Sequence, residues 1–133
     1  MTRGPRVLAG ALLLVGALAT ACGSPPAAVE AVVENGDTVE IVVDLLVRFD
    51  DARGDAQVQT LMDGVVVAAG GQAPAAFDAP RGEKLLFESS VVRAGTTWEM
   101  PGIETPARRG TFVFHWAPLV GGGYGYETAD WAE

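Results

Sequence analysis

The chain has 133 residues and a formal net charge of −8, because 17 acidic residues outnumber 9 basic ones. This acidic balance argues against nucleic-acid binding and against direct adsorption to anionic lipid, since both depend on clustered basic side chains. The single cysteine excludes an intrachain disulfide, and a hydrophobic content of 49% argues against a disordered chain.

Residues 1–21 have the order of a secretory signal peptide. Arg3 and Arg6 precede an apolar stretch over residues 7–21, and the first acidic residue is Glu30. A membrane-spanning helix needs about 20 apolar residues, and this stretch is shorter and contains two glycines. The segment therefore predicts export of the chain, with an uncleaved anchor helix as the alternative.

Cys22 ends the sequence Leu18-Ala19-Thr20-Ala21-Cys22, which resembles the lipobox of bacterial lipoproteins. The resemblance covers the first 22 residues and the Gly-Ser-Pro-Pro that follows. It implies cleavage before Cys22, a diacylglyceryl group on the Cys22 sulfur, and acylation of the new amino group, for example with palmitate. The family prefers leucine three residues before the cysteine, and this chain has Ala19 there. An ordinary signal peptide with an incidental cysteine is the other interpretation.

The lipobox resemblance implies that the mature protein is held at a membrane surface without a spanning helix. One acyl chain binds membranes only marginally, whereas two or three anchor a protein stably. The expected location is the outer face of the cell membrane, or the outer membrane in a bacterium with two membranes, which Gly23 favours. Residues 22–28 are predicted to form a tether, and residues 29–133 to form one domain.

The mature segment has the pattern of a series of β-strands. Residues 29–34 lead to Asn35-Gly36, a strong two-residue hairpin signal, with a short helix capped by Gly36 as the alternative. Between residues 38 and 49, apolar and polar side chains alternate, which is typical of a strand with one buried face. The buried face is predicted to carry Val39, Ile41, Val43, Leu45, Val47 and Phe49.

Further short strands follow, with turn signals at intervals of roughly 8–12 residues. They are predicted at residues 56–62, 65–69, 84–92, 96–100 and 111–116. Asp63-Gly64 is predicted to form a second hairpin turn, residues 70–82 and 101–110 to form loops, and residues 121–131 to form a loop or weak edge strand. This spacing predicts an all-β fold, an antiparallel Greek-key β-sandwich of the immunoglobulin-like type.

No metal or cofactor is expected. The segments NGDTVEIVV and GTFVFHW loosely resemble the first and last strands of cupredoxin domains. Copper in such a domain needs two histidines, a cysteine and usually a methionine, but the mature segment offers only His115 with Met62 and Met100. The resemblance is therefore limited to sandwich architecture, and a zinc site lacks ligands for the same reason.

Two sets of residues have the chemistry of hydrolysis. Ser89 or Ser90 would need His115 as a general base, but a solvent-facing or hydrogen-bonded structural role is the simpler interpretation of this histidine. Glu88 and Glu99 could form a glycosidase-type carboxylate pair. Because a chain with 17 acidic residues contains such pairs by chance, we expect a protein that is not an enzyme.

The segment FDDARGD, residues 49–55, allows two specific interpretations. Asp50, Asp51 and Asp55 are clustered oxygen ligands for calcium, although the EF-hand spacing is absent. Arg53-Gly54-Asp55 is an integrin-type tripeptide at a predicted hairpin tip. A polar turn that ends a long strand is the simpler interpretation.

The last third of the chain is rich in aromatic residues on glycine-rich segments, a composition found in many binding surfaces. The candidate partner-binding residues are Trp98, His115, Trp116, Tyr124, Tyr126 and Trp131. The alternative is that Trp98 and Trp116 fill the sandwich core while the tyrosines pack an edge strand.

Together these features predict an envelope lipoprotein that is tethered through Cys22 and acts as a non-catalytic binding module. The partner is expected to be an envelope protein, with a glycan as the second choice and no role for nucleic acid. Two alternatives stay open: a structural or assembly accessory of a larger envelope complex, and a small hydrolase that uses paired carboxylates.

Overall fold

The computed structural model describes residues 25–133, and all of its regular secondary structure is β-strand. In chain order the strands are β1 (Ala27–Asn35), β2 (Ile41–Asp50), β3 (Ala56–Val67), β4 (Gln72–Ala79), β5 (Lys84–Arg93), β6 (Thr96–Glu99), β7 (Ile103–Pro106), β8 (Gly110–Pro118) and β9 (Tyr124–Trp131). The predicted signal peptide and Cys22 lie outside the described residues. Since β1 starts at Ala27, the last two residues assigned to the tether belong to the first strand.

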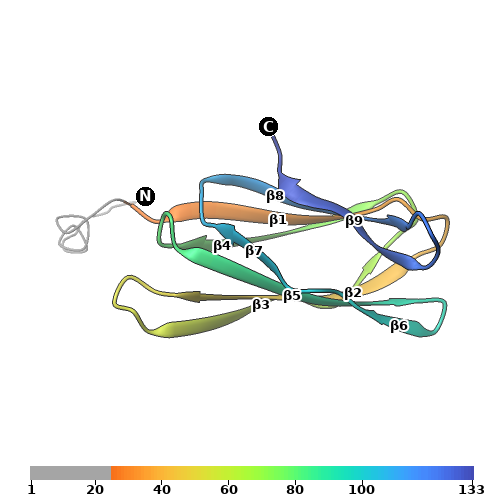
Figure 1. Cartoon of the computed structure of the whole chain (residues 1–133), viewed down its shortest axis with the longest axis horizontal. Coiled ribbons are helices and arrows are strands. Elements are labelled where there is room, and N and C mark those ends of the chain that lie inside the picture. Colours follow the sequence, from red (N-terminus) through yellow and green to blue (C-terminus); the bar gives the residue numbers. More distant parts are fainter. Residues whose placement is uncertain (1–24) are drawn as a thin grey trace, which may run out of the picture.

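The strands form two sheets that pack face to face, with strand orders β4-β1-β8-β9 and β3-β2-β5-β6 (Figure 1). β7 also pairs with β5 and continues the line of β6. Glu99 lies opposite Ser90 and Ile103 lies opposite Phe87, so the break between β6 and β7 inserts one extra residue, as in a β-bulge. The predicted all-β sandwich is confirmed.

One strand pair departs from the predicted antiparallel arrangement. β1 lies beside β8 in parallel register, from Val29 opposite Gly110 to Asn35 opposite Trp116. A parallel pair cannot be joined by a tight hairpin, so its strands are distant in sequence. The local alternation of side chains therefore carries no information about this pairing.

The inner faces of the two sheets form one hydrophobic core. As the alternation predicts, β2 buries the side chains of Ile41, Val43, Leu45, Val47 and Phe49. Val39 lies before the strand and is exposed, contrary to the prediction. At the centre of the core, the ring of Phe87 contacts the rings of Phe77, Phe112 and Phe114. Full burial of each such side chain stabilises the fold by about 1.5–3 kcal/mol.

The predicted hairpin turn at Asn35-Gly36 is wrong, and so is its helical alternative. β1 and β2 belong to different sheets, so residues 36–40 cross the sandwich. The buried Asn35 amide donates to the carbonyl oxygens of Val39 at 2.9 Å and Val67 at 3.1 Å. Its oxygen accepts a hydrogen bond from the Asp37 N–H at 2.9 Å. Asn35 thus satisfies the backbone of a crossing loop instead of forming a tight turn.

The predicted turn at Asp63-Gly64 is also wrong, because β3 runs through it. The register of β3 against β2 shifts near Asp44, and the Gly64 N–H donates to an Asp44 carboxylate oxygen at 2.8 Å. Gly64 has a φ of 63°, which glycine adopts without strain. The two residues form an irregularity within one strand and do not separate two strands.

Two predicted loops contain strands. Residues 70–82 include β4, which pairs with β1, and residues 101–110 include β7. β4 consists largely of alanine and contains Pro74, a composition of low strand propensity. Its pairing with β1 and the burial of Phe77 and Ala79 decide its structure. Residues 121–131 were predicted to form a loop or a weak edge strand. They contain β9, which is an edge strand.

Candidate functional site

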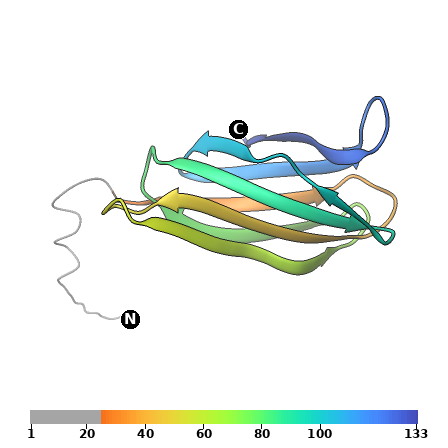
Figure 2. The ribbon, with the colours of Figure 1, turned by 60° about the horizontal axis from the view of Figure 1, so that its bottom comes forward.

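The strands place the connecting loops at two opposite ends of the sandwich (Figures 1 and 2). The proximal end contains the start of β1 and the loops at residues 51–55, 80–83 and 107–109. The distal end contains the loops at residues 36–40, 68–71, 94–95 and 119–123.

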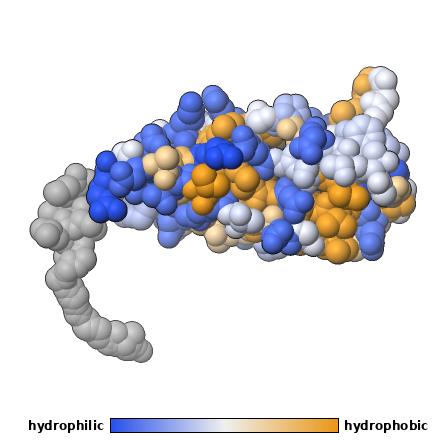
Figure 3. Space-filling model, turned by 90° about the horizontal axis from the view of Figure 1, so that it is seen from below, coloured by the Kyte–Doolittle hydropathy of each residue, from blue (hydrophilic) through white to orange (hydrophobic). Residues whose placement is uncertain are grey.

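The two ends differ strongly in charge. The charged side chains of the proximal loops are Asp51, Arg53, Asp55, Arg81, Glu83, Arg108 and Arg109. Those of the distal loops are only Asp37, which is buried, and Glu40; glycine, alanine and other uncharged residues make up the rest. Figure 3 colours one face by hydropathy: the proximal end, at the left, is largely blue, and orange and pale residues mix with blue ones toward the distal end, at the right.

The loop between β8 and β9, residues Leu119–Gly123, projects from the distal end (Figure 2). Val120 is fully exposed and Leu119 is partly exposed. The Leu119 N–H donates to the Gly123 carbonyl at 2.9 Å, and three consecutive glycines with positive φ complete the loop. The sequence therefore presents two aliphatic side chains to solvent on a short, internally hydrogen-bonded loop.

A packed aromatic cluster lies beneath this loop. The Trp116 ring is fully buried and stacks on Tyr124, with ring centroids 6.1 Å apart and an interplanar angle of 14°. The Trp98 ring meets Tyr124 edge-on at 5.7 Å. The Arg93 guanidinium lies over the Tyr124 ring, 3.8 Å from its centroid. A side chain at Gly123 would have its Cβ 3.3 Å from Trp98, so the loop packs closely on this cluster.

A buried ion pair fixes the base of the cluster. The Asp37 carboxylate accepts hydrogen bonds from the Arg93 guanidinium, from the Trp116 indole N–H at 3.3 Å and from the Thr38 N–H at 2.6 Å. Hydrogen bonding from Arg93 lowers the pKa of the Asp37 carboxyl to about 2. One carboxylate therefore joins the β1–β2 crossing to β5 and β8.

The six candidate contact residues do not share one surface. Trp116 has no exposed area and cannot touch a partner, as the core alternative predicted. Tyr126 bonds to the Ser89 hydroxyl at 2.7 Å, and burial raises the pKa of Tyr126 to about 12. Trp131 lies near the proximal end and donates to the Thr105 hydroxyl at 2.8 Å. Three of the six are therefore occupied within the fold.

The other three candidates keep some exposure. Trp98 and Tyr124 are half-buried at the distal end. His115 lies on the outer face of its sheet, where Nδ1 is 3.1 Å from a Glu34 oxygen. Sequence reasoning missed Leu119 and Val120; their signal is two aliphatic residues between a strand and a run of three glycines.

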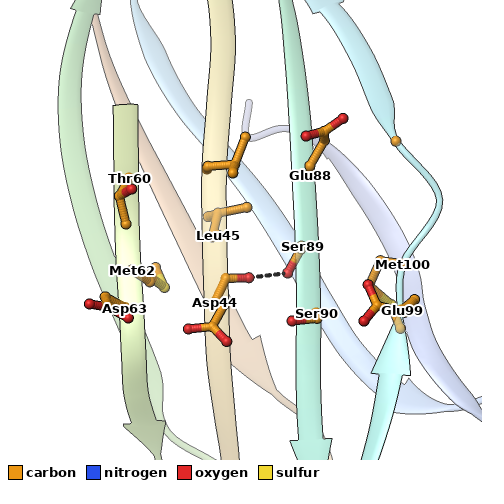
Figure 4. A pocket seen from close by; sticks show the side chains of 12 residues that line it. Asp44, Leu45, Thr60, Met62, Asp63, Glu88, Ser89, Ser90, Glu99 and Met100 are labelled. Atoms are coloured by element: carbon orange, nitrogen blue, oxygen red, sulfur yellow. Dashed lines mark hydrogen bonds between the residues drawn. The ribbon is translucent and has the colours of Figure 1, made fainter. Parts of the chain in front are cut away.

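A shallow pocket of about 530 Å³ lies on the outer side of the β3-β2-β5-β6 sheet (Figure 4). The predicted carboxylate pair, Glu88 and Glu99, lines this pocket together with Asp44 and Asp63. Glu88 is exposed and pairs with Arg48, whose Nε lies 2.9 Å from a Glu88 oxygen. A general acid works best in a water-excluded site that holds its proton, and this pocket is open.

The serine and histidine of the considered hydrolytic set are not brought together. The Ser89 hydroxyl contacts Tyr126 in the interior and donates to the Asp44 carbonyl at 2.8 Å. His115 faces outward on the other sheet, opposite in direction to Phe114 and Trp116. Within residues 25–133, no group of three or more His, Cys, Asp or Glu side chains is arranged to hold a metal ion.

The proximal segment FDDARGD forms a hydrogen-bonded turn. One oxygen of the Asp51 carboxylate accepts from the backbone N–H groups of Arg53 at 2.8 Å and Asp55 at 2.9 Å, and these bonds lower the Asp51 pKa. Its other oxygen accepts from the Gln57 amide at 3.1 Å. These contacts match the polar-turn interpretation, because the Asp51 oxygens are already bonded within the loop.

Comparison of the chain with protein-family models, curated proteins and solved structures gave no match. In the part of the chain from residue 25 onward, no helix has the length and hydropathy needed to cross a membrane.

Proposed function

We propose that this protein is a membrane-tethered envelope lipoprotein that acts as a non-catalytic binding module for a protein partner. The β8–β9 loop is the contact surface in this proposal. One observation carries it: Val120 is fully exposed, beside Leu119, on a loop that rests on the packed aromatic cluster. Exposed aliphatic side chains on a supported loop fit an apolar pocket of another protein with little loss of conformational entropy.

The position of the loop supports the same proposal. β1 runs from the proximal to the distal end, so a lipid on Cys22 would enter the membrane from the proximal side. The β8–β9 loop would then face away from that membrane. Because the distal loops carry almost no exposed charge, burial of this end against a partner would desolvate few ionised groups.

The two other functions have less support. Glycan binding uses a free aromatic face, and the Tyr124 ring is packed against Trp116 and covered by Arg93. Hydrolysis by Glu88 and Glu99 would have to proceed in an open pocket, where Arg48 already neutralises Glu88. If no partner requires the loop, the remaining function is that of a structural accessory in a larger envelope complex.

The tether is tested by Cys22→Ala in cells that receive a labelled fatty acid. We expect the wild-type protein to carry the label and to sediment with membranes, and the variant to lose both properties. Unchanged membrane retention of an unlabelled variant would refute lipid anchoring.

The contact surface is tested by crosslinking in cells and recovery of the tagged protein. Val120→Asp places a charge at the loop tip and should reduce recovery of the enriched envelope partner at least tenfold. Val66→Asp is the matched control, because Val66 is also exposed, at 57%, but lies on β3. Equal recovery with both variants would remove the loop from the contact surface.

A further inference from the structure

The sandwich has four edges, and three of them are protected against pairing with another strand. An unprotected edge presents free N–H and C=O groups to any extended chain. Pro74 removes a donor from β4, and Pro101 and Pro106 lie along the β6–β7 edge. On β9, the Trp131 indole bonds to Thr105 of the opposite sheet, and Glu127 and Asp130 add charge to this strand. These are the usual means of blocking an edge.

β3 is the exception. It is the longest strand, with 12 residues, and contains no proline, lysine or arginine. It forms one border of its sheet, seen along the lower side of the sandwich in Figure 2. Its register against β2 is regular from Ala56 opposite Asp50 to Thr60 opposite Leu46. The proximal half of β3 is therefore a straight, unguarded edge.

The β2–β3 hairpin shows which backbone groups of this edge are free. The Asp51 N–H donates to the Asp55 carbonyl at 2.8 Å and closes the loop. Hydrogen-bonded and non-hydrogen-bonded pairs alternate in an antiparallel ladder, so Ala56, Val58 and Thr60 form the non-hydrogen-bonded pairs with β2. Their N–H and C=O groups point away from β2, and the Val58 side chain is 54% exposed.

A hollow of about 830 Å³ lies beside this edge, between the proximal halves of β3 and β4. Phe49 and Ala79, both buried, form its apolar base, and Gln57 and Gln59 border it on the β3 side. The acidic residues Asp51, Asp78 and Glu83 are among the residues that line the hollow, and Arg81 is the one basic residue among them. Asp78 alternates with the buried Phe77 and Ala79, so its side chain points to the outer face of its own sheet. Asp51 and Glu83 therefore hold the negative charge beside the hollow.

We propose that the β3 edge over Ala56–Thr60 binds an extended segment of a partner protein by strand addition, and that a lysine or arginine of this segment enters the hollow. Backbone hydrogen bonds to Ala56, Val58 and Thr60 provide the affinity, and the hollow provides the selectivity. The alkyl part of the basic side chain packs on Phe49 and Ala79, while its charge lies near Asp51 and Glu83.

A second copy of this chain fits the same edge less well. Pairing of β3 with its own copy would bring Gln57 and Gln59 toward the hollow, and neither side chain carries a positive charge. The net charge of −8 also opposes association of two copies. The proposed surface belongs to the proximal half of the sandwich and is independent of the β8–β9 loop.

The test uses the full chain in mild detergent and a set of synthetic eight-residue peptides. The peptides alternate valine and threonine and differ at one central position, which is lysine, arginine, leucine or glutamate. Binding is measured by fluorescence anisotropy, and amide hydrogen exchange is measured by NMR. We expect the lysine and arginine peptides to bind at least tenfold more tightly than the glutamate peptide and to protect the amides of Ala56, Val58 and Thr60.

Two variants separate the edge from the hollow. Val58→Pro removes one outward donor without breaking the ladder to β2, so binding of every peptide should be lost while the circular dichroism spectrum is kept. The Glu83→Gln variant should keep peptide binding but weaken the preference for lysine and arginine.

Three results would overturn the proposal. They are protection of no β3 amide by any peptide, equal binding of the glutamate and lysine peptides, and a dimer in sedimentation that Val58→Pro dissociates. The last result would assign the edge to a second copy of this chain.

Discussion

The two ends of the sandwich are held together by different kinds of interaction. At the proximal end, the exposed Asp51 carboxylate organises the β2–β3 turn through backbone N–H groups, among loops rich in charge. At the distal end, the buried Asp37 carboxylate bonds to Arg93 and Trp116 below loops with almost no charge. Stability at the distal end therefore comes from beneath the surface. Its outermost residues, Leu119 and Val120, lie outside this buried network and are exposed.

The largest expected effect is at the buried aromatic cluster. Trp116→Ala leaves a cavity beneath the distal loops and should lower the free energy of unfolding by about 3–5 kcal/mol. Urea denaturation followed by circular dichroism measures the change. A loss below about 1 kcal/mol would show that the distal end does not depend on this ring.

The next effect is a pH dependence that comes from Asp37. Because its pKa is lowered to about 2 from an ordinary value near 3.8, its contribution is present above pH 4 and is lost as the pH falls toward 2. This contribution is about 2 kcal/mol. Asp37→Asn should therefore show a smaller fall in unfolding free energy between pH 5 and pH 2 than the wild-type protein. Parallel pH curves for the two proteins would contradict the role of the ion pair.

A smaller effect is expected at the proximal turn. Asp51→Ala removes the acceptor for the Arg53 and Asp55 N–H groups, but water can replace it because the turn is exposed. The midpoint of urea unfolding should fall by less than in Asp37→Asn at neutral pH. If Asp51→Ala were the more damaging change, the contrast between the two ends would be reversed.

The smallest effect on stability is expected at the loop tip. Val120→Asp touches no buried group and should change the free energy of unfolding by no more than about 0.5 kcal/mol. Calorimetric unfolding of this variant is also the control for its loss of partner recovery. A marked fall in the melting temperature would mean that the loop stabilises the fold, and the binding result would lose its meaning.

The strands with strong alternation could be predicted from the sequence, and those fixed by distant contacts could not. The alternating residues of β2 have one buried face, as their period of two requires. β4 has a composition typical of a loop and becomes a strand because it pairs with β1. Asn35-Gly36 has the sequence of a tight turn, but the buried Asn35 amide donates hydrogen bonds to the backbone around a loop that joins the two sheets.

The candidate site was predictable only in part for the same reason. Composition identified the aromatic residues of the last third of the chain, but it does not distinguish a ring in the core from a ring on the surface. Trp116 became buried because it lies on the inner face of β8, whereas Leu119 lies just beyond the end of that strand. Their difference in exposure is decided by where the strand ends, which depends on its pairing with β9.

The parallel pairing of β1 with β8 has a consequence for how the chain reaches its folded state. β1 lies in the middle of its sheet, between β4 and β8, so its hydrogen bonding is complete only when residues 110–116 are in place. Such long-range closure gives a high contact order and slows folding. For a chain that is exported as we propose, slow folding keeps the polypeptide unfolded, and therefore able to cross the membrane, until nearly all of it has left the cytoplasm.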